Sequence, residues 1–269
     1  MQDLIRGYYD KRAVEEWQRH DRHRMEFMIS QRVLERHLPS TGRVLDCGGG
    51  PGRYALWLAA KGYDVTLFDL ATANLDKARV EASKDGLTLR FEEGTATDLA
   101  RFEGASFDAV LLMGPLYHLF DLSERQSAVK EAARVLRNGG VIAAAFLNRT
   151  AALRYVAKEE AGRILELYKP MINVIEQGYD DGFPPADNDH FHAYFSHPSE
   201  IEPLLRGAGL APISTYATEG FVSFIDEDVN QAEGDAWDAW VELNLRLASD
   251  PYLFLCADHL LAFAAKEGA

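Results

Sequence analysis

Residues 44–59, VLDCGGGPGRYALWLA, combine a carboxylate, a cluster of glycines and the beginning of a helical pattern. Asp46 lies near the end of a short apolar segment. Glycine allows a backbone to turn tightly and to approach a ligand closely, and the first turn of a helix offers free N–H groups. The pattern therefore predicts a nucleotide-type binding turn between a strand and a helix, with the glycines at Gly48, Gly49, Gly50 and Gly52.

The spacing of this turn does not fit the common phosphate-binding motifs. Arg53 stands where the dinucleotide fingerprint G-x-G-x-x-G has its third glycine, and G-x-x-x-x-G-K-[ST] is absent. A carboxylate just before the turn would repel a pyrophosphate, but it suits an ammonium group. The next apolar segment ends at Asp69, which is placed to accept hydrogen bonds from two ribose hydroxyls. A ribose and an amino acid without phosphate describe S-adenosylmethionine (SAM).

Short apolar segments alternate with amphipathic segments of helical length through the first half of the chain. This alternation predicts a parallel sheet with helices on both faces. The expected strands cover 43–47, 64–69, 87–93, 107–114 and 141–147. The expected helices cover 53–62, 72–86 and 122–140.

Composition limits the class of partner. Lys and Arg number 28 against 42 Asp and Glu, a net charge of −14, so neither nucleic acid nor an anionic membrane is an expected partner. The arginines of residues 6–36 alternate with acids, which indicates a solvated helical face. They are Arg6, Arg12, Arg19, Arg22, Arg24, Arg32 and Arg36.

The remaining sequence signals point to a cytoplasmic protein. Cys47 and Cys256 form no metal or disulfide framework, so we expect buried structural thiols. The N-terminus has no apolar region typical of a signal peptide. No apolar run approaches the roughly 20 residues that span a bilayer.

Four segments in this order resemble the class I SAM-dependent methyltransferases. VLDCGGGPGRYALWLA is similar to the first motif of that family, and VTLFDLA to the acidic end of its second strand. SFDAVLLMGPLYHL and AARVLRNGGVIAAAF are similar to the fourth-strand motif and to the helix, turn and fifth strand. The resemblance covers about residues 43–147. It implies an α/β fold with a Rossmann-like, seven-stranded, mostly parallel sheet, N-terminal helices and a helical cap insertion.

The resemblance also implies roles for individual residues, with SAM as cofactor and S-adenosylhomocysteine (SAH) as product. Asp46 and the turn 48–52 would line the methionine part, Asp69 would hold the ribose, and Leu70 would pack on the adenine. Family members usually carry an acidic residue after the third strand, where this chain has Thr95. Adenine recognition is therefore expected from Thr95, the backbone of Ala96 and Asp98, while Met113 and Gly114 would face the cofactor.

For the chain as a whole, the resemblance suggests a lid, a core and a cap. Residues 1–40 would form an N-terminal helical lid and 41–148 the SAM-binding core. Residues 149–196 would form a cap insertion, and 197–269 the C-terminal part of the core, with a helical insertion at 226–249. Such a cap would exclude water and shape an apolar pocket, which favours a small or medium-sized acceptor.

Three residues are candidates for contact with the methyl acceptor. His118 lies just past the fourth expected strand and could act as a general base or position the acceptor. Tyr9 could place a phenol over the methyl group, and His192 would share a strand face with His190. Each has an alternative interpretation as a packed structural residue. The two histidines and nearby acids lack a third defined ligand, so we expect no metal.

The leading hypothesis is transfer of a methyl group to an O or N atom of a small molecule. The acidic charge counts against RNA substrates, and MGPLY stands where amino-methylating nucleic-acid enzymes carry N-P-P-Y. A macromolecule (RNA or protein) methyltransferase and a SAM-binding regulatory protein without turnover remain alternatives. An NAD-dependent dehydrogenase is disfavoured by Arg53. The sequence leaves the acceptor open, and also whether the protein forms a homodimer.

Overall fold

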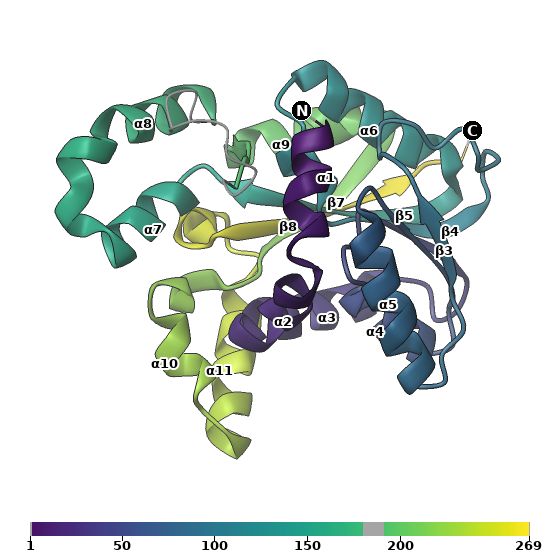
Figure 1. Cartoon of the computed structure of the whole chain (residues 1–269), viewed down its shortest axis with the longest axis horizontal. Helices are drawn as coiled ribbons and strands as arrows, with labels where there is room; N and C mark the ends of the chain where they lie inside the picture. Colours follow the sequence, from purple (N-terminus) through teal and green to yellow (C-terminus); the bar gives the residue numbers. More distant parts are fainter. Residues whose placement is uncertain (1, 180–190, 269) are drawn as a thin grey trace.

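The computed structural model describes residues 2–179 and 191–268 of the chain. Within these residues, eight strands form one sheet in the order β3-β2-β1-β4-β5-β8-β7, with the short β6 paired to β5 (Figure 1). The strands are β1 (Arg43–Cys47), β2 (Asp64–Asp69), β3 (Arg90–Glu93), β4 (Phe107–Leu112), β5 (Leu136–Asn148), β6 (Phe195–Ser196), β7 (Leu210–Ala217) and β8 (His259–Lys266).

Most neighbouring strands run parallel. β1 pairs in this way with β2 and β4, β2 with β3, and β4 with β5. β8 runs antiparallel to both of its neighbours, β5 and β7. The expected seven-stranded, mostly parallel, Rossmann-like sheet is confirmed along this path. The strand order reverses between β1 and β4, and ligands of open α/β sheets bind at the carboxyl ends of the strands beside such a reversal.

Helices cover both faces of the sheet, and each face has its own apolar core. Val44 of β1 belongs to one core and Leu45 to the other, because successive side chains of a strand point to opposite faces. The core around Val44 includes α3 (Arg24–His37), α4 (Arg53–Ala60) and α5 (Thr72–Lys84). The core around Leu45 includes α6 (Leu122–Val135) and α9 (Pro198–Arg206).

The N-terminal segment forms three helices, α1 (Gln2–Asp10), α2 (Ala13–Arg22) and α3. In Figure 1, α1 lies over the middle of the sheet beside α5, and both α1 and α2 contact α5. These helices therefore stand next to the turn that follows β1.

Two helical pairs lie outside the sheet layers. α7 (Ala151–Glu159) and α8 (Ile164–Gln177) pack on each other around Val156, Leu167 and Met171, and Figure 1 shows them extending to one side. α10 (Asp226–Asn230) and α11 (Gly234–Leu247) contact α3 instead. No helix among residues 2–179 and 191–268 is long and apolar enough to cross a membrane.

The structure corrects three local expectations. The helix expected over 122–140 ends at Val135, and Leu136 already pairs with Phe107 of β4 before a register shift to Ala109 and Val141. The strand expected over 87–93 begins only at Arg90. Cys47 is fully buried as expected, but Cys256 is only partly buried.

Candidate active site

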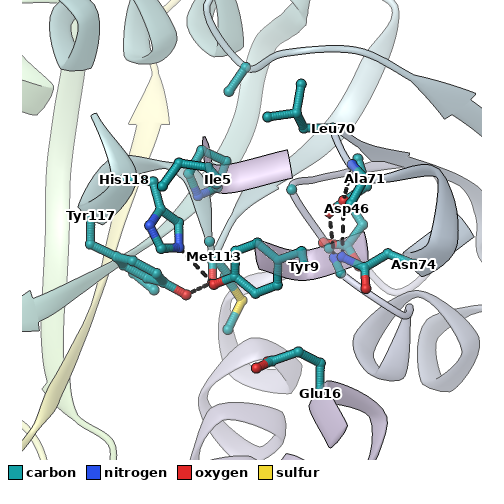
Figure 2. A pocket seen from close by; sticks show the side chains of 18 of the residues that line it. Ile5, Tyr9, Glu16, Asp46, Leu70, Ala71, Asn74, Met113, Tyr117 and His118 are labelled. Atoms are coloured by element: carbon teal, nitrogen blue, oxygen red, sulfur yellow. Dashed lines mark hydrogen bonds between the residues drawn. The ribbon is translucent and has the colours of Figure 1, made fainter. Parts of the chain in front are cut away.

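The main cavity of the described residues opens at the carboxyl ends of β1, β2 and β4 (Figure 2). The turn after β1 and the segments after β2, β3 and β4 line one part of it, and α1, α2 and α3 line another. Most of the residues expected to contact the cofactor lie on its wall: Asp46, Gly48, Gly49, Gly50, Asp69, Leu70, Thr95, Ala96 and Met113.

The turn after β1 uses backbone conformations that glycine adopts readily. Gly48, Gly50 and Gly52 have φ values of +70°, +57° and +85°, a region that costs other residues roughly 1–2 kcal/mol. A Cβ on Gly48 would lie 2.3 Å from Cγ of Pro115, so two loops meet there without room for a side chain. A Cβ on Gly50 would meet only the amide nitrogen of Asn74, at 3.9 Å. Bare backbone therefore borders the cavity at Gly50.

Gly52 does not line the cavity. It precedes α4, and a Cβ at this position would stand 2.9 Å from Cδ2 of Leu67. Gly52 thus allows close packing between the turn and the sheet, while Gly48, Gly49 and Gly50 border the cavity.

Asp46 places a buried carboxylate at the bottom of the site. Its side chain is inaccessible to water in the closed fold, and neither carboxylate oxygen has a hydrogen-bond partner among the described residues. Burial and the nearby charge of Asp69 raise the pKa of Asp46 to about 7, although the backbone N–H of Ala55 in α4, which is directed at the carboxylate without forming a full hydrogen bond, acts in the opposite direction. An unpartnered buried carboxylate is costly, and a cationic group of a ligand would stabilise its charged form.

Asp69 is already engaged by the protein. Its Oδ2 accepts a hydrogen bond from the Gly50 amide at 2.8 Å, and its Oδ1 accepts from the Ala71 amide at 2.9 Å and from Asn74 Nδ2 at 3.1 Å. A carboxylate has about four lone-pair sites, so one remains for a ligand. Asp69 therefore fixes the glycine turn in addition to facing the cavity.

The segment after β3 brings Thr95 and Ala96 to the cavity wall. The hydroxyls of Thr95 and Thr97 are hydrogen-bonded to each other at 3.1 Å, and the Thr95 hydroxyl also accepts a hydrogen bond from Nε2 of Gln2 in α1 at 3.4 Å. Asp98 is not among the described residues that line the cavity; one of its carboxylate oxygens accepts a hydrogen bond from the amide of Ala100.

Tyr9, His118 and His192 meet in a short hydrogen-bonded chain. The Nδ1–H of His118 donates to the carbonyl oxygen of His192 at 2.8 Å, which leaves Nε2 to accept from the Tyr9 hydroxyl at 2.7 Å (Figure 2). Burial lowers the pKa of His118 to about 4 and raises that of Tyr9 well above its ordinary value. Both side chains are therefore neutral at physiological pH.

The outcome for the three acceptor candidates differs. Tyr9 and His118 line the cavity, whereas His192 does not, and its backbone rather than its ring contacts His118. The partners that the histidine motif would have needed, His190 with Asp187 and Asp189, lie outside the described residues.

A charged network that was not expected from the sequence lines another wall of the cavity. Arg19 of α2 forms a bidentate ion pair with Glu26 of α3, with N···O distances of 2.5 and 2.8 Å. His259, at the start of β8, forms a hydrogen bond through Nδ1 with the buried carboxylate of Glu219. The same Nδ1 lies 3.9 Å from Oε2 of Glu26. Arg19, Glu26 and His259 all line the cavity together with Glu16 of α2.

The solvated face expected for the arginines is wrong for Arg19. Its guanidinium is mostly covered and pairs with a nearly buried carboxylate. Glu16 and Arg19 are three residues apart, so they share a face of α2, and this spacing was the available signal. Nothing in the sequence connects them to Glu219 and His259, which the sheet brings in from the far end of the chain.

Charge within this network is balanced in pairs. Burial alone would lower the pKa of His259, but the carboxylates of Glu26 and Glu219 outweigh it and raise that pKa to about 9. Burial alone would raise the pKa of Glu219, but His259 lowers it to about 2. Glu26, Glu219 and His259 have the spacing of a metal site, yet Arg19 and the proton of His259 already neutralise the two carboxylates.

This strand order, with a glycine turn and a buried carboxylate at the switch point, defines a Rossmann-like methyltransferase fold. A family model described as "Methyltransferase domain" matches residues 44–140. A ubiquinone biosynthesis O-methyltransferase of Paraburkholderia phymatum is 33% identical over 205 residues, covering 73% of this chain and 79% of that protein. One of Xanthomonas axonopodis pv. citri is 30% identical over 181 residues, covering 66% of each chain.

Solved structures of low sequence identity share the fold. The 1,6-didemethyltoxoflavin-N1-methyltransferase of Burkholderia thailandensis, solved with SAH bound, superimposes with a TM-score of 0.58 at 19% identity, covering 99% of this chain and 86% of that one.

The alignment with the Xanthomonas relative spans only about two thirds of that protein's length. The chain belongs to the family of SAM-dependent methyltransferases.

Proposed function

We propose that this protein transfers a methyl group from SAM to an O or N atom of a small-molecule acceptor. The observation that carries the proposal is the buried, unpartnered carboxylate of Asp46 beside the bare backbone of the glycine turn. SAM, when bound, supplies a methyl group on a positively charged sulfur, and the protein mainly orients the acceptor.

The cavity wall offers a complementary group for each part of SAM. Asp46 would hold the ammonium group, and the remaining lone-pair site of Asp69 would accept from a ribose hydroxyl. Leu70, Thr95 and Ala96 would border the adenine, and Met113 would face the sulfur end. Asp69 was expected to accept from two hydroxyls, but three donors of the protein already occupy most of its capacity.

Tyr9 and His118 would position the lid and the ligand rather than accept a proton. Both ring nitrogens of His118 are hydrogen-bonded, so accepting a proton at Nε2 would break the bond from Tyr9. That bond ties α1 to the loop after β4. His192 would support the pair through its backbone carbonyl.

We propose that residues 1–40 act as the lid of the site. Four residues of α1 line the cavity: Gln2, Ile5, Arg6 and Tyr9. Contacts from the middle and the C-terminal end of α1 hold it against the core, from Arg6 to Glu93 at 3.3 Å and from Asp10 to the Ala73 amide at 3.1 Å. The lid must release these contacts before a ligand can enter.

The described parts of the expected cap and of the insertion 226–249 do not border the cavity directly. No described residue of 149–179, 191–196 or 226–249 lines the cavity. The ring of Phe191, however, lies 6.0 Å from that of Tyr8 and 5.4 Å from that of His118. The segment beginning at Phe191 would therefore cover the edge of the site, and α10 and α11 would instead support α3.

Several observations favour a small acceptor. The relatives are named as O-methyltransferases of ubiquinone biosynthesis. The net charge of −14 disfavours nucleic acid. A cytoplasmic location and a homodimer stay predictions.

Calorimetry with SAH tests the cofactor part of the proposal. We expect SAH and SAM to bind and NAD to give no heat, because the turn lacks the third glycine of the dinucleotide fingerprint. A protein that is folded by circular dichroism but gives no heat with SAH or SAM would contradict the proposal.

A further inference from the structure

The cavity extends beyond the groups assigned to SAM. Its remaining wall comes from α2, α3, α4 and β8, and we call this part the acceptor chamber. It is lined by Glu16, Arg19, Glu26, Tyr54 and His259. A chamber lined by aromatic and charged groups and joined to the cofactor cavity is suited to a small polar ligand.

Glu16 differs from the other charged groups of the chamber. Arg19 pairs with Glu26, and His259 pairs with Glu219. Glu16 lines the cavity (Figure 2), and its carboxylate forms no hydrogen bond or ion pair with another described residue. It is the one carboxylate of the chamber that is left to accept a hydrogen bond from a ligand.

Arg19 offers the complementary donor. A guanidinium has five N–H groups, and the bidentate pair with Glu26 uses two of them. Because Glu16 and Arg19 lie three residues apart on α2, an acceptor group and a donor group stand side by side on one helix face.

We propose that the acceptor chamber binds the methyl acceptor, with Glu16 accepting a hydrogen bond from its nucleophilic hydroxyl or N–H and Arg19 donating to a neighbouring oxygen. The ligand class is thus a small molecule whose nucleophilic group stands beside a carbonyl or anionic oxygen. This inference rests on the proposed function, since it needs SAM in the adjoining cavity.

The role of Glu16 includes proton removal when the nucleophile is a hydroxyl. The hydroxyl oxygen forms the new C–O bond while the methyl–sulfur bond breaks and its electron pair stays on sulfur, and the hydroxyl proton moves to a carboxylate oxygen of Glu16. Burial raises the pKa of Glu16, with the charges of Arg19 and Arg22 acting in the opposite direction. A carboxylate with a raised pKa is a stronger base.

Other titratable groups face Glu16 and bear on its charge. Glu15 and Glu26 raise its pKa by repulsion, and Tyr9 and Tyr117 feel its charge in turn. Burial raises the pKa values of Tyr9 and Tyr117, so both phenols are neutral near neutral pH, and Glu26 is held by its ion pair with Arg19. His20 of α2 also lines the chamber, but burial and the charge of Arg19 hold its pKa well below the ordinary value, so it is a weak base. Glu16 is therefore the carboxylate of the chamber that we expect to take the proton of the acceptor.

The test compares Glu16→Gln with Glu15→Gln, a matched change on the exposed side of the same helix. Wild type and both variants are loaded with SAH, equilibrated with the small-molecule fraction of a cell extract, and filtered. Retained compounds are identified by mass spectrometry, and turnover with SAM is measured separately. SAH affinity by calorimetry shows that each variant is folded.

We expect all three proteins to bind SAH alike. Glu16→Gln should hold the compound retained by the wild type about tenfold or more weakly, from loss of a charged hydrogen bond. It should methylate that compound about 10²-fold or more slowly, the range for general-base residues. Glu15→Gln should match the wild type.

The contrary outcomes separate the two claims. If Glu16→Gln retains and methylates the compound as well as Glu15→Gln does, the acceptor chamber is assigned wrongly while the proposed function stands. If the wild type binds no SAH or methylates no compound in any fraction, the proposed function fails and this inference fails with it.

Discussion

The two parts of the cavity, which we propose bind the cofactor and the acceptor, are built by different means. The cofactor part depends on backbone: glycines with positive φ, an unpartnered Asp46 and the short loops after β1 and β4. The acceptor chamber depends on side-chain charges from α2, α3 and β8, balanced in pairs except for Glu16. A backbone turn tolerates few changes, whereas charged side chains on surrounding helices can vary with the ligand. We infer that the proposed donor site is built into the sheet, whereas the proposed acceptor site is added by the helices.

Breaking the charge network should give the largest effect on stability. Glu219→Ala removes the carboxylate that holds the proton of the partly buried His259, which must then lose that proton or keep an uncompensated charge; we expect a loss of about 3–5 kcal/mol of the free energy of unfolding. Chemical denaturation measures this change. The matched control is Glu202→Ala, which removes an exposed pair with Arg206 and should cost at most about 0.5 kcal/mol. Equal losses in the two variants would show that the network does not support the chamber.

The pair formed by His259 and Glu219 predicts that stability depends on pH. The folded pKa of His259, about 9, lies above its ordinary value of 6.5. Its contribution is therefore complete below pH 6.5 and is lost as the pH rises through 9. Glu219→Ala should remove most of that slope, and an unchanged slope would assign it to other groups.

The second-largest effect is expected from adding a side chain to the glycine turn, which should weaken cofactor binding. Gly48→Ala forces a Cβ against Pro115. It should lower the free energy of unfolding by about 1–3 kcal/mol, the range for overpacking. We expect SAH affinity to fall by about tenfold or more. Gly62→Ala is the control, because Gly62 also has positive φ but no atom lies within 4 Å of the added Cβ. A similar loss of affinity in both would refute the role of the turn.

Asp46→Asn sharpens the comparison further, since it keeps the shape and removes the charge. We expect about 1.5–3 kcal/mol weaker SAH binding, the value of a hydrogen bond to a charged group. In the wild type, affinity should be highest above pH 7 and fall as the pH drops below about 7, because protonation of Asp46 removes its attraction for an ammonium group. Calorimetry across this range measures both. If the SAH affinity of Asp46→Asn falls with pH in the same way as that of the wild type, Asp46 is not the group that binds the ammonium.

The lid pair should give the smallest effect. His118→Ala and Tyr9→Phe each remove the hydrogen bond between α1 and the loop after β4. Each should lower kcat by about tenfold with little change in SAM affinity, and the double variant should be no worse than either single one, because both lose the same contact. A loss in the double variant equal to the product of the two single losses would mean that the residues act separately.

The fold and the cofactor part were predictable from sequence because both are local. Residues 44–52 carry their own turn chemistry, and strands alternating with helices determine a parallel sheet. The end of α6 at Val135 was missed because Leu136 joins the sheet before the glycines that suggested the stop. The acceptor chamber was missed because it assembles Glu16, Arg19 and His259 from opposite ends of the chain.

The central claim is methyl transfer from SAM to a small molecule, and SAH release tests it most directly. The protein is supplied with SAM and with a cell extract separated into small-molecule, protein and RNA fractions. The account predicts SAH release with the small-molecule fraction alone, together with a compound heavier by one methyl group. Release only with protein or RNA would contradict the acceptor class, and no release with SAM bound would favour a regulatory protein without turnover.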